Sequence, residues 1–396
     1  MKTMKIGEEK GVALILGMLL LLVATLIGIN ALNTSMVDVL IAGNERTSVQ
    51  AFYVAEAGIH EFMGRFREGA THEIVDSDPT NPNWKVLLAS YPGKGATQIG
   101  YSSANPNSYL SLQTKLDYGV EIKHKIDSMN QVVTYGGAPI YILRSFGFTR
   151  DGGNKALEVE IRKSSGYDPP AAIYSERPIS IQGNSTYING YNGCASIHHK
   201  PGVMTPTTTL PPIIELDNPP IDGSPPKMTR MNYPLLPILP IKEMIDYIKG
   251  DANFKYSYSE NHTLTGYSNS WGMPISHDSN LPITYSGPMN IIYFNMNGDK
   301  TLTLAGGSHG AGLLLVEGNL VVNGDFTWYG VILTTGSVVI TGSGEKNLTG
   351  GLLSGGTASV TAGSGGDLGF IYCSGVSNHL KSIVPPLKMN RWREIF

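Results

Sequence analysis

Three features are scarce in this sequence, and each scarcity excludes a class of protein. Cysteine occurs only twice among 396 residues, which is too few for a disulfide-stabilised scaffold. Charged residues make up 15% of the chain and the formal net charge is -3, so no overall positive field favours nucleic acid as a partner. No phosphate-binding glycine loop or HExxH motif occurs either, so the sequence carries neither of these signatures and implies no cofactor.

Long hydrophobic runs are also scarce, with one exception at residues 12–29, where Thr25 has the only polar side chain. A run of this length is just long enough to cross a hydrocarbon core about 30 Å thick. Helices buried in soluble proteins keep a polar face over so many turns, so a membrane-spanning helix is the better interpretation. The lysines of residues 1–10 predict a cytoplasmic amino terminus, with the remainder of the chain outside the cytoplasm.

The helical pattern continues beyond the hydrophobic run as far as Arg67, because residues 30–67 contain no proline and keep an amphipathic stripe. At about 1.5 Å per residue, a helix over residues 12–67 would be roughly 84 Å long. A cleaved secretory signal would end in a small-residue processing motif, which is missing here. The stripe consists of Phe52, Ala55, Ile59, Phe62 and Phe66.

Three segments carry a resemblance to a known family, namely GVALI at residues 11–15, IAGN at residues 41–44 and AFYVAEAG at residues 51–58. They are similar to the PilX N-terminal family of type IV pilus minor pilins. The resemblance implies that a prepilin peptidase cuts between Gly11 and Val12, removing residues 1–11 as a leader, and that Val12 is then methylated. It also implies that the helix forms the core of a filament, and we assign helix–helix assembly to Leu16, Phe52, Ala55, Ile59 and Phe62.

The resemblance also implies where the chain acts and with what. Such subunits are stored in the inner membrane as single-pass proteins and then extracted into an extracellular filament. Many pilins have a glutamate at the fifth mature residue, where this chain has Leu16, and its absence is known among minor subunits thought to lie at a filament tip. The implied partners are other pilin subunits, the peptidase, the inner membrane and a surface or glycan ligand.

The next region predicts a sheet. Residues 69–106 are polar and turn-rich, which indicates mostly loop. A two-residue alternation then begins at Leu116 and recurs at residues 140–149 and 157–161 on either side of a glycine turn, which is typical of an antiparallel sheet with one wet face. We predict that this sheet packs on the outer half of the helix, with Phe52, Phe62 and Phe66 beneath it. Residues 12–67 and 68–166 would then form an α+β pilin-like arrangement.

A repeat of 18 to 20 residues follows in residues 302–362. Short strands with glycine corners at this period fit a parallel β-helix, whose coils bury an apolar core only by stacking. The same template occurs at residues 173–183, so we predict a β-rich solenoid domain over residues 167–384 that contains an insertion at 196–286. The equivalent apolar positions are Leu302, Leu320, Val338 and Ala358, and then Leu304, Val322, Ile340 and Val360.

The insertion is rich in proline and then predicts one short helix after Pro240. We interpret it as an exposed excursion from the solenoid. Its aromatic residues have two interpretations: packing against the solenoid, which we favour, and a surface that binds sugars or another subunit. Residues 385–396 are predicted as a C-terminal tail, whose Trp392, Arg393 and Phe396 pack on the last coil or cap its open end. The aromatic residues of the insertion are Tyr256, Tyr258, Tyr267, Trp271 and Tyr285.

Candidate reactive groups are few. His198 and His199 form a pair, but metal sites need three or four convergent ligands. Asn-Gly-Asp corners at residues 297–299 and 323–325 lack the alternating acids of a calcium site. Parallel β-helices also occur in polysaccharide-cleaving enzymes, but the predicted outward positions carry no cluster of acids or bases, so we predict neither metal nor catalysis. Those outward positions are Thr303, Val321, Val339 and Ser359.

The two cysteines present conflicting arguments. A pair in an exported chain would ordinarily form a disulfide. The repeat register, however, places Cys194 and Cys373 in the same slot of coils four or five steps apart, which is roughly 20 Å at about 4.8 Å per coil. If the coils stack in chain order we expect two buried free thiols, whereas docking of the early coil elsewhere in the stack would let them meet.

These observations predict a non-enzymatic minor pilin that serves filament assembly, priming or contact with a surface at the tip. The alternative is a membrane-anchored β-helix adhesin or carbohydrate-binding protein that never polymerises. A polysaccharide-cleaving enzyme is the third hypothesis. Processing at Gly11 distinguishes the first hypothesis from the second.

Overall fold

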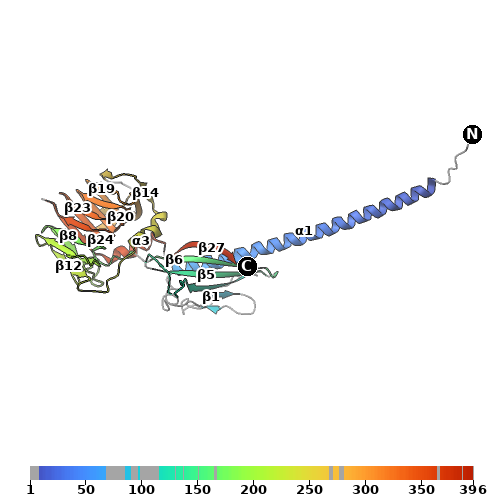
Figure 1. The fold of residues 1–396 in the computed structure, drawn as a ribbon, viewed down its shortest axis with the longest axis horizontal. Coiled ribbons are helices and arrows are strands. Elements are labelled where there is room, and N and C mark those ends of the chain that lie inside the picture. The colour runs from blue at the N-terminus through green and yellow to red at the C-terminus, as the bar shows by residue number, and fades with distance from the viewer. Residues whose placement is uncertain are drawn as a thin grey trace, which may run out of the picture. The chain divides into compact units, whose positions relative to one another are not determined.

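The computed structural model describes residues 9–67, 85–90, 97–98, 116–129, 131–136, 138–149, 151–164, 167–266, 271–275, 281–363, 366–385 and 387–395. The chain divides into two compact units, one from Met1–Lys123, Ile142–Glu160 and Arg391–Phe396 and the other from His124–Tyr141 and Ile161–Asn390. The predicted fold class is confirmed: a long N-terminal helix and an antiparallel sheet are followed by a strand-rich region of parallel sheets (Figure 1).

The long helix α1 runs from Glu9 to Arg67. No proline interrupts it, and the hydroxyl groups of Thr25 and Thr34 find a partner within the helix, because each donates to the carbonyl four residues earlier. Burial of its side chains begins at Thr47, so the second half of α1 is the part that packs within its unit. The leader, residues 1–11, lies outside the described residues except for its last three positions.

The sheet of the first unit has the strand order β2-β1-β3-β5-β6-β27, and β4 pairs with β5. The alternation predicted from Leu116 is confirmed, since Tyr118, Val120 and Ile122 are all buried. β1 and β2 were not predicted, because they lie in the stretch interpreted as mostly loop. The strands are β1 (Lys85–Ser90), β2 (Thr97–Gln98), β3 (Leu116–His124), β4 (Thr134–Tyr135), β5 (Ala138–Thr149), β6 (Asn154–Lys163) and β27 (Leu387–Ile395).

Two glycines allow the sheet to lie close against α1. An added Cβ on Gly147 of β5 would collide with the backbone of Ala51 and Ala55, and one on Gly58 of α1 would lie 2.5 Å from the Ser145 hydroxyl. The side chains of Ala55, Ile59 and Phe62 are buried on this face of the helix. Because these two glycines have no side chain, α1 and the sheet can pack closely where they cross.

The C-terminal segment is not a tail. Residues 387–395 form β27, which lies next to β6 in the sheet of the first unit. Trp392 contacts Phe52 of α1, with ring centroids 6.0 Å apart, so neither it nor Arg393 caps the last coil as predicted. Phe396 lies outside the described residues. In sequence, the strands of the parallel sheets therefore come between β6 and β27, which are neighbours in the antiparallel sheet.

The second unit is built from two long parallel sheets, to which successive passes of the chain add one strand each. We call this arrangement the coil stack. The first sheet contains β7 (Ile173–Ser175), β9 (Thr186–Asn189), β10 (Val203–Thr205), β12 (Ile221–Asp222), β13 (Lys227–Thr229), β14 (Phe254–Ser257), β18 (Asn290–Asn295), β20 (Ser308–Glu317), β22 (Phe326–Thr334), β24 (Lys346–Ser354) and β26 (Leu368–Ile371). The second sheet contains β8 (Ile179–Gln182), β11 (Ile213–Leu216), β15 (His262–Thr265), β19 (Thr301–Ala305), β21 (Asn319–Asn323), β23 (Val338–Thr341) and β25 (Ala358–Thr361).

The repeat register is confirmed position by position. Leu302 pairs with Leu320, Leu320 with Val338, and Val338 with Ala358. These side chains point inward and are almost completely buried, and the next inward position along each strand repeats the pattern. Each strand alone could bury only one side, so the continuous apolar core comes from stacking.

The order of the coils departs from the prediction. The coils that follow residue 254 stack in chain order, but β24 then pairs along its first half with β26 and along its second half with β7. In sequence, β26 is the last strand of the stack and β7 is the first, and these two strands together complete one coil beside β24. β25 pairs with β8 and β26 with β9, so the early coils continue the stack beyond its late end.

The insertion is not an excursion, because its strands extend the stack at both ends. β10, β11 and β12 add a layer on β7, β8 and β9, while β14 and β15 add a layer on β18 and β19. The predicted short helix is confirmed as α3 (Ile241–Ile248), which is followed by the 3-10 turn η1 (Lys249–Asp251). The remaining elements are α4 (Ser374–Leu380) and the hairpin strands β16 (Met273–Ile275) and β17 (Thr284–Ser286).

Candidate assembly surface

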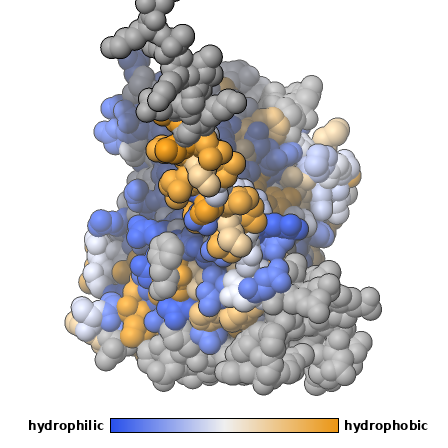
Figure 2. Space-filling view, turned by 90° about the vertical axis from the view of Figure 1, so that its right-hand side faces the viewer, coloured by the Kyte–Doolittle hydropathy of each residue, from blue (hydrophilic) through white to orange (hydrophobic). Residues whose placement is uncertain are grey.

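The first half of α1 presents a long apolar surface. Every side chain from residue 12 to residue 46 is exposed, and the segment is the one helix among the described residues that is long and apolar enough to cross a membrane. Figure 2 shows this surface as the hydrophobic atoms that follow the grey N-terminal residues. Nothing in the first unit covers it within the described residues.

One bilayer crossing would leave part of this surface uncovered. At about 1.5 Å per residue, residues 12–46 extend roughly 52 Å, against a hydrocarbon core of about 30 Å. The residues beyond the crossing include Leu32, Met36, Val39 and Leu40, each more than 60% exposed. An apolar surface of this extent ordinarily marks a contact with another molecule.

The structure separates the predicted assembly residues into two groups. Leu16 is 61% exposed on the open part of α1, as an assembly role requires. Ala55, Ile59 and Phe62 are buried against the sheet of their own unit, so for these three the assembly assignment is wrong. The same amphipathic stripe that suggested a helix–helix contact is used by the chain itself. Phe52 is half-buried at the edge between the two regions.

Trp392 was missed as a member of this surface. Its ring is 61% exposed and contacts Phe52, whose ring centroid is 5.8 Å from that of the exposed Tyr53. The three rings form an aromatic cluster beside the exposed part of α1. The last ten residues show no sustained two-residue alternation, so the sequence offered no clear signal for this strand.

Ion pairs hold β27 in place. Glu158 on β6 accepts hydrogen bonds from Arg393 Nε at 3.0 Å and from Arg144 Nη2 at 3.0 Å. Burial of Glu158 raises the pKa of its carboxyl, but the hydrogen bonds from Arg393 and Arg144 outweigh burial and hold that pKa below its usual value. Lys155 and Glu394 form a second pair between the same two strands.

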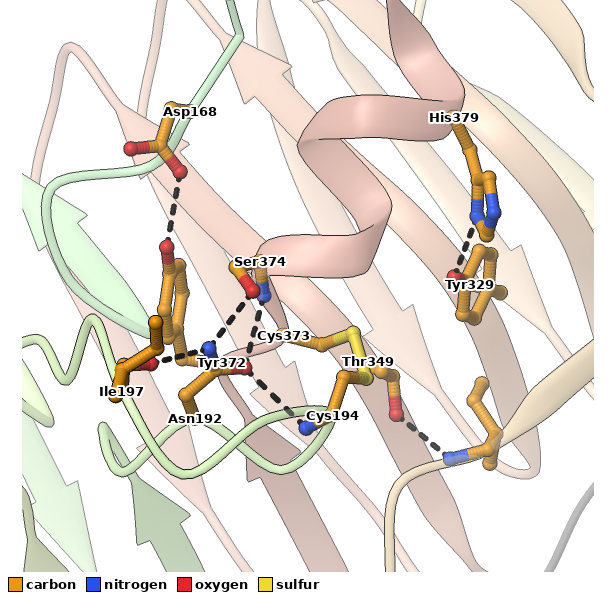
Figure 3. Close-up of a disulfide and its surroundings, with 11 residues drawn as sticks. Asp168, Asn192, Cys194, Ile197, Tyr329, Thr349, Tyr372, Cys373, Ser374 and His379 are labelled. Atoms are coloured by element: carbon orange, nitrogen blue, oxygen red, sulfur yellow. Dashed lines mark hydrogen bonds between the residues drawn. A yellow bond between two sulfur atoms is a disulfide. The ribbon is translucent and has the colours of Figure 1, made fainter.

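A disulfide joins Cys194 and Cys373, which overturns the prediction of two free thiols (Figure 3). Their Cα atoms are 5.2 Å apart, within the usual range for a bridge. The assumption of chain-order stacking failed because the early coil docks on the late end of the stack. The prediction that Cys194 and Cys373 occupy equivalent positions of the repeat was wrong as well, because β26 pairs with β24 at a spacing of 22 residues rather than 19.

Hydrogen bonds also join the two segments that the disulfide links, as Figure 3 shows. The Asn192 side chain accepts from the backbone N–H of Cys194 and of Ser374 and donates to Ile197 O and Ser374 Oγ, at 2.7–3.2 Å. Asp168 accepts from the Tyr372 hydroxyl at 3.0 Å. One asparagine thus satisfies backbone groups from two segments 180 residues apart in sequence, and no sequence pattern marks it.

Other candidate groups have structural roles. His199 Nδ1 accepts the backbone N–H of Asn192, and no group of three or more metal-binding side chains occurs within the described residues. In the insertion, Trp271 is buried, Tyr256 stacks on Phe294 and Tyr285 stacks on Tyr329, which supports packing against the stack. Tyr267 lies outside the described residues.

Comparison with known proteins agrees with the N-terminal segment. Residues 10–60 match the model of the PilX N-terminal family. Among solved structures the chain is similar to the competence-associated pilin ComZ from Thermus thermophilus, at 13% identity over 88% of this chain and 98% of that chain, with a TM-score of 0.26. A likeness of that size carries no argument about this chain. No curated protein matches the sequence.

Proposed function

We propose that this chain, whose N-terminal helix is of the type IV pilin-like PilX kind, is a non-enzymatic minor pilin. It is stored in the inner membrane through residues 12–29 and then extracted into an extracellular filament. The observation that carries the proposal is the exposed surface of residues 12–46 in α1, which is longer than one bilayer crossing. In a filament, the helices of neighbouring pilin subunits would cover the remainder.

Processing of the leader is the first test. The GVALI boundary at residues 11–15 predicts that prepilin peptidase cuts after Gly11 and that Val12 becomes N-methylated. Mass spectrometry of the amino terminus in purified filaments measures this directly. An intact Met1, with the chain confined to the membrane fraction, would instead favour the non-polymerising adhesin or carbohydrate-binding protein.

Leu16 sets the expected position of the subunit. A leucine at the fifth mature residue cannot pair with the terminal amine of a neighbouring subunit, so we propose a low copy number and a place at the tip, in assembly, priming or contact with a surface or glycan. Immunogold labelling should be sparse and terminal, whereas uniform labelling along the filament would contradict this. Leu16→Glu should raise the copy number relative to its uncharged control Leu16→Gln.

The coil stack has the strand arrangement of a parallel β-helix. The outward positions of β19, β21, β23 and β25 carry threonine, valine, serine, alanine and asparagine, which the register places side by side. This sheet face offers no pair of acids for hydrolysis of a polysaccharide, which supports a binding or structural role.

A further inference from the structure

The two ends of the coil stack differ in charge. At the end formed by β11 to β13, Glu215 occupies an inward register position, paired with Ile181 of the next coil. Its carboxylate accepts a hydrogen bond from Lys227 Nζ at 2.6 Å. Another coil placed on this end would bury an ion pair against apolar side chains, so the charges block further stacking.

The opposite end, formed by β14 and β15, carries no such block (Figure 1). Its inward positions are Phe254, Tyr256, His262 and Leu264, and the coil beneath them pairs with them in register. In that coil the equivalent side chains are buried, whereas all four at the end are only half-buried. The terminal layer therefore resembles an interior coil that has lost one neighbour.

Within the described residues, no further strand pairs with the backbone at this end. β14 and β15 each end the strand order of their sheet within the described residues. Gly266 donates its backbone N–H to Ala305 O at 3.0 Å. Since successive residues of a strand point their backbone groups to opposite sides, the N–H and C=O groups of Thr263 and Thr265 point away from β19 toward the open edge.

The floor of the open end is aromatic and flat. The Tyr256 ring stacks on Phe294 with centroids 4.7 Å apart and an interplanar angle of 15°. The Tyr258 and His262 rings stack on each other with centroids 3.6 Å apart. Such rings provide apolar area for alternate side chains of a strand laid across them.

We propose that the β14–β15 end binds an extended segment of another filament subunit, which pairs with the open edge and covers the four inward side chains. Only a polypeptide strand satisfies both the edge N–H and C=O groups and an apolar floor spaced at every second residue. The surface is continuous with the coil–coil contacts of the stack itself. The choice of a filament subunit as partner rests on the proposed function, while the strand chemistry does not.

Photo-crosslinking in cells that assemble the filament tests this proposal. A crosslinking residue is placed at position 263 or 265 of the full chain, and matched controls carry it at positions 214 or 216, the outward positions of β11 at the blocked end. We expect adducts from 263 and 265 on one segment of another subunit, at sites two residues apart as strand pairing requires. Positions 214 and 216 should give none.

A proline variant isolates the backbone contribution. Thr263→Pro removes an N–H that points to the open edge and so costs no bond to β19. It should lower the adduct yield from position 265 about tenfold, the effect of about one lost hydrogen bond. Thr263→Val keeps the N–H and should keep the yield. Equal thermal unfolding of the two variants confirms that the fold is intact.

Three outcomes would overturn the proposal: no adduct at the open end, equal adducts at both ends, or adducts only with polysaccharide or with the same positions of a second copy. Immunogold labelling of the same cells separates this failure from failure of the proposed function. Filaments that contain the subunit but give no adduct leave the pilin role standing and remove the strand-docking role.

Discussion

The strands of the helix-and-sheet unit and of the coil stack both arise from alternating apolar residues. The two regions differ in what determines which strands lie next to each other. In the first unit, β5 and β6 follow each other in sequence, only four residues apart, and pair directly, so sequence order sets their spatial order. In the coil stack most coils offer a similar inward apolar surface, so a coil can dock on one that does not precede or follow it in sequence. The chain uses this equivalence, because β26 and β7 share one coil.

The comparison extends to what holds each region together. The first unit depends on close backbone approach at Gly147 and on ion pairs around Glu158. The stack depends on inward apolar side chains and on one covalent link at its composite coil. The two regions should therefore respond to different substitutions, and the following predictions test that separation.

The largest effect is expected from a charge placed inside the stack. Val338→Asp or Ile340→Asp should lower the free energy of unfolding of the stack by about 3–5 kcal/mol, because a buried carboxylate without a partner is strongly unfavourable. Val339→Asp is the matched control, since its side chain is half-buried and points outward between the same two residues. Thermal unfolding measures all three. Equal destabilisation by Val339→Asp would contradict the inward assignment.

Removal of the disulfide should come next. Cys194→Ser combined with Cys373→Ser releases a link between residues 179 apart, and should cost about 2–5 kcal/mol of stack stability. Hydrogen exchange should rise in β7, β9 and β26 and not in β3 or β5. Non-reducing peptide mapping is the direct check, and two free thiols in the native chain would contradict the composite coil.

The helix crossing should give a smaller effect. Gly147→Ala forces a methyl group into the backbone of α1 at Ala51 and Ala55, and should cost about 1–3 kcal/mol in the first unit only. Gly43→Ala is the control on the same helix, where no atom lies within 4 Å, and it should be neutral or stabilising by about 1 kcal/mol or less. Urea denaturation compares them, and similar midpoints would argue against the close crossing.

Protonation of Glu158, a carboxyl of the first unit, should have the smallest effect. Because the folded pKa of Glu158 lies below its usual value, its contribution is fully present above the unfolded pKa of about 4.3 and is lost as pH falls through the lower folded pKa. The loss should be about 1 kcal/mol or less, since Arg393 is exposed. Glu158→Gln should remove this pH dependence, and an unchanged profile would assign it to other carboxylates.

Much of the fold could be predicted from local pattern. The proline-free apolar run gave α1, the alternation from Leu116 gave β3, and the i, i+3, i+4, i+7 spacing after Pro240 gave α3. The strands β1 and β2 were not predicted, because the polar, turn-rich composition of residues 69–106 indicates mostly loop, although the two strands pair with each other. Of the candidate assembly residues, Leu16 is exposed and its assembly role stays a prediction, while Ala55, Ile59 and Phe62 are buried by the chain's own sheet.

Sequence alone determined the apolar N-terminal helix and the stacking of the coils in residues 302–362 through equivalent inward positions. Both follow from hydrophobic patterns that extend over a short stretch of sequence. Only the tertiary structure decided the order of the coils, the Cys194–Cys373 bridge and the return of β27 to the first sheet. The physical reason is the same in each case. Equivalent apolar surfaces and unpaired strand edges accept more than one partner, and burial across the whole chain selects among them.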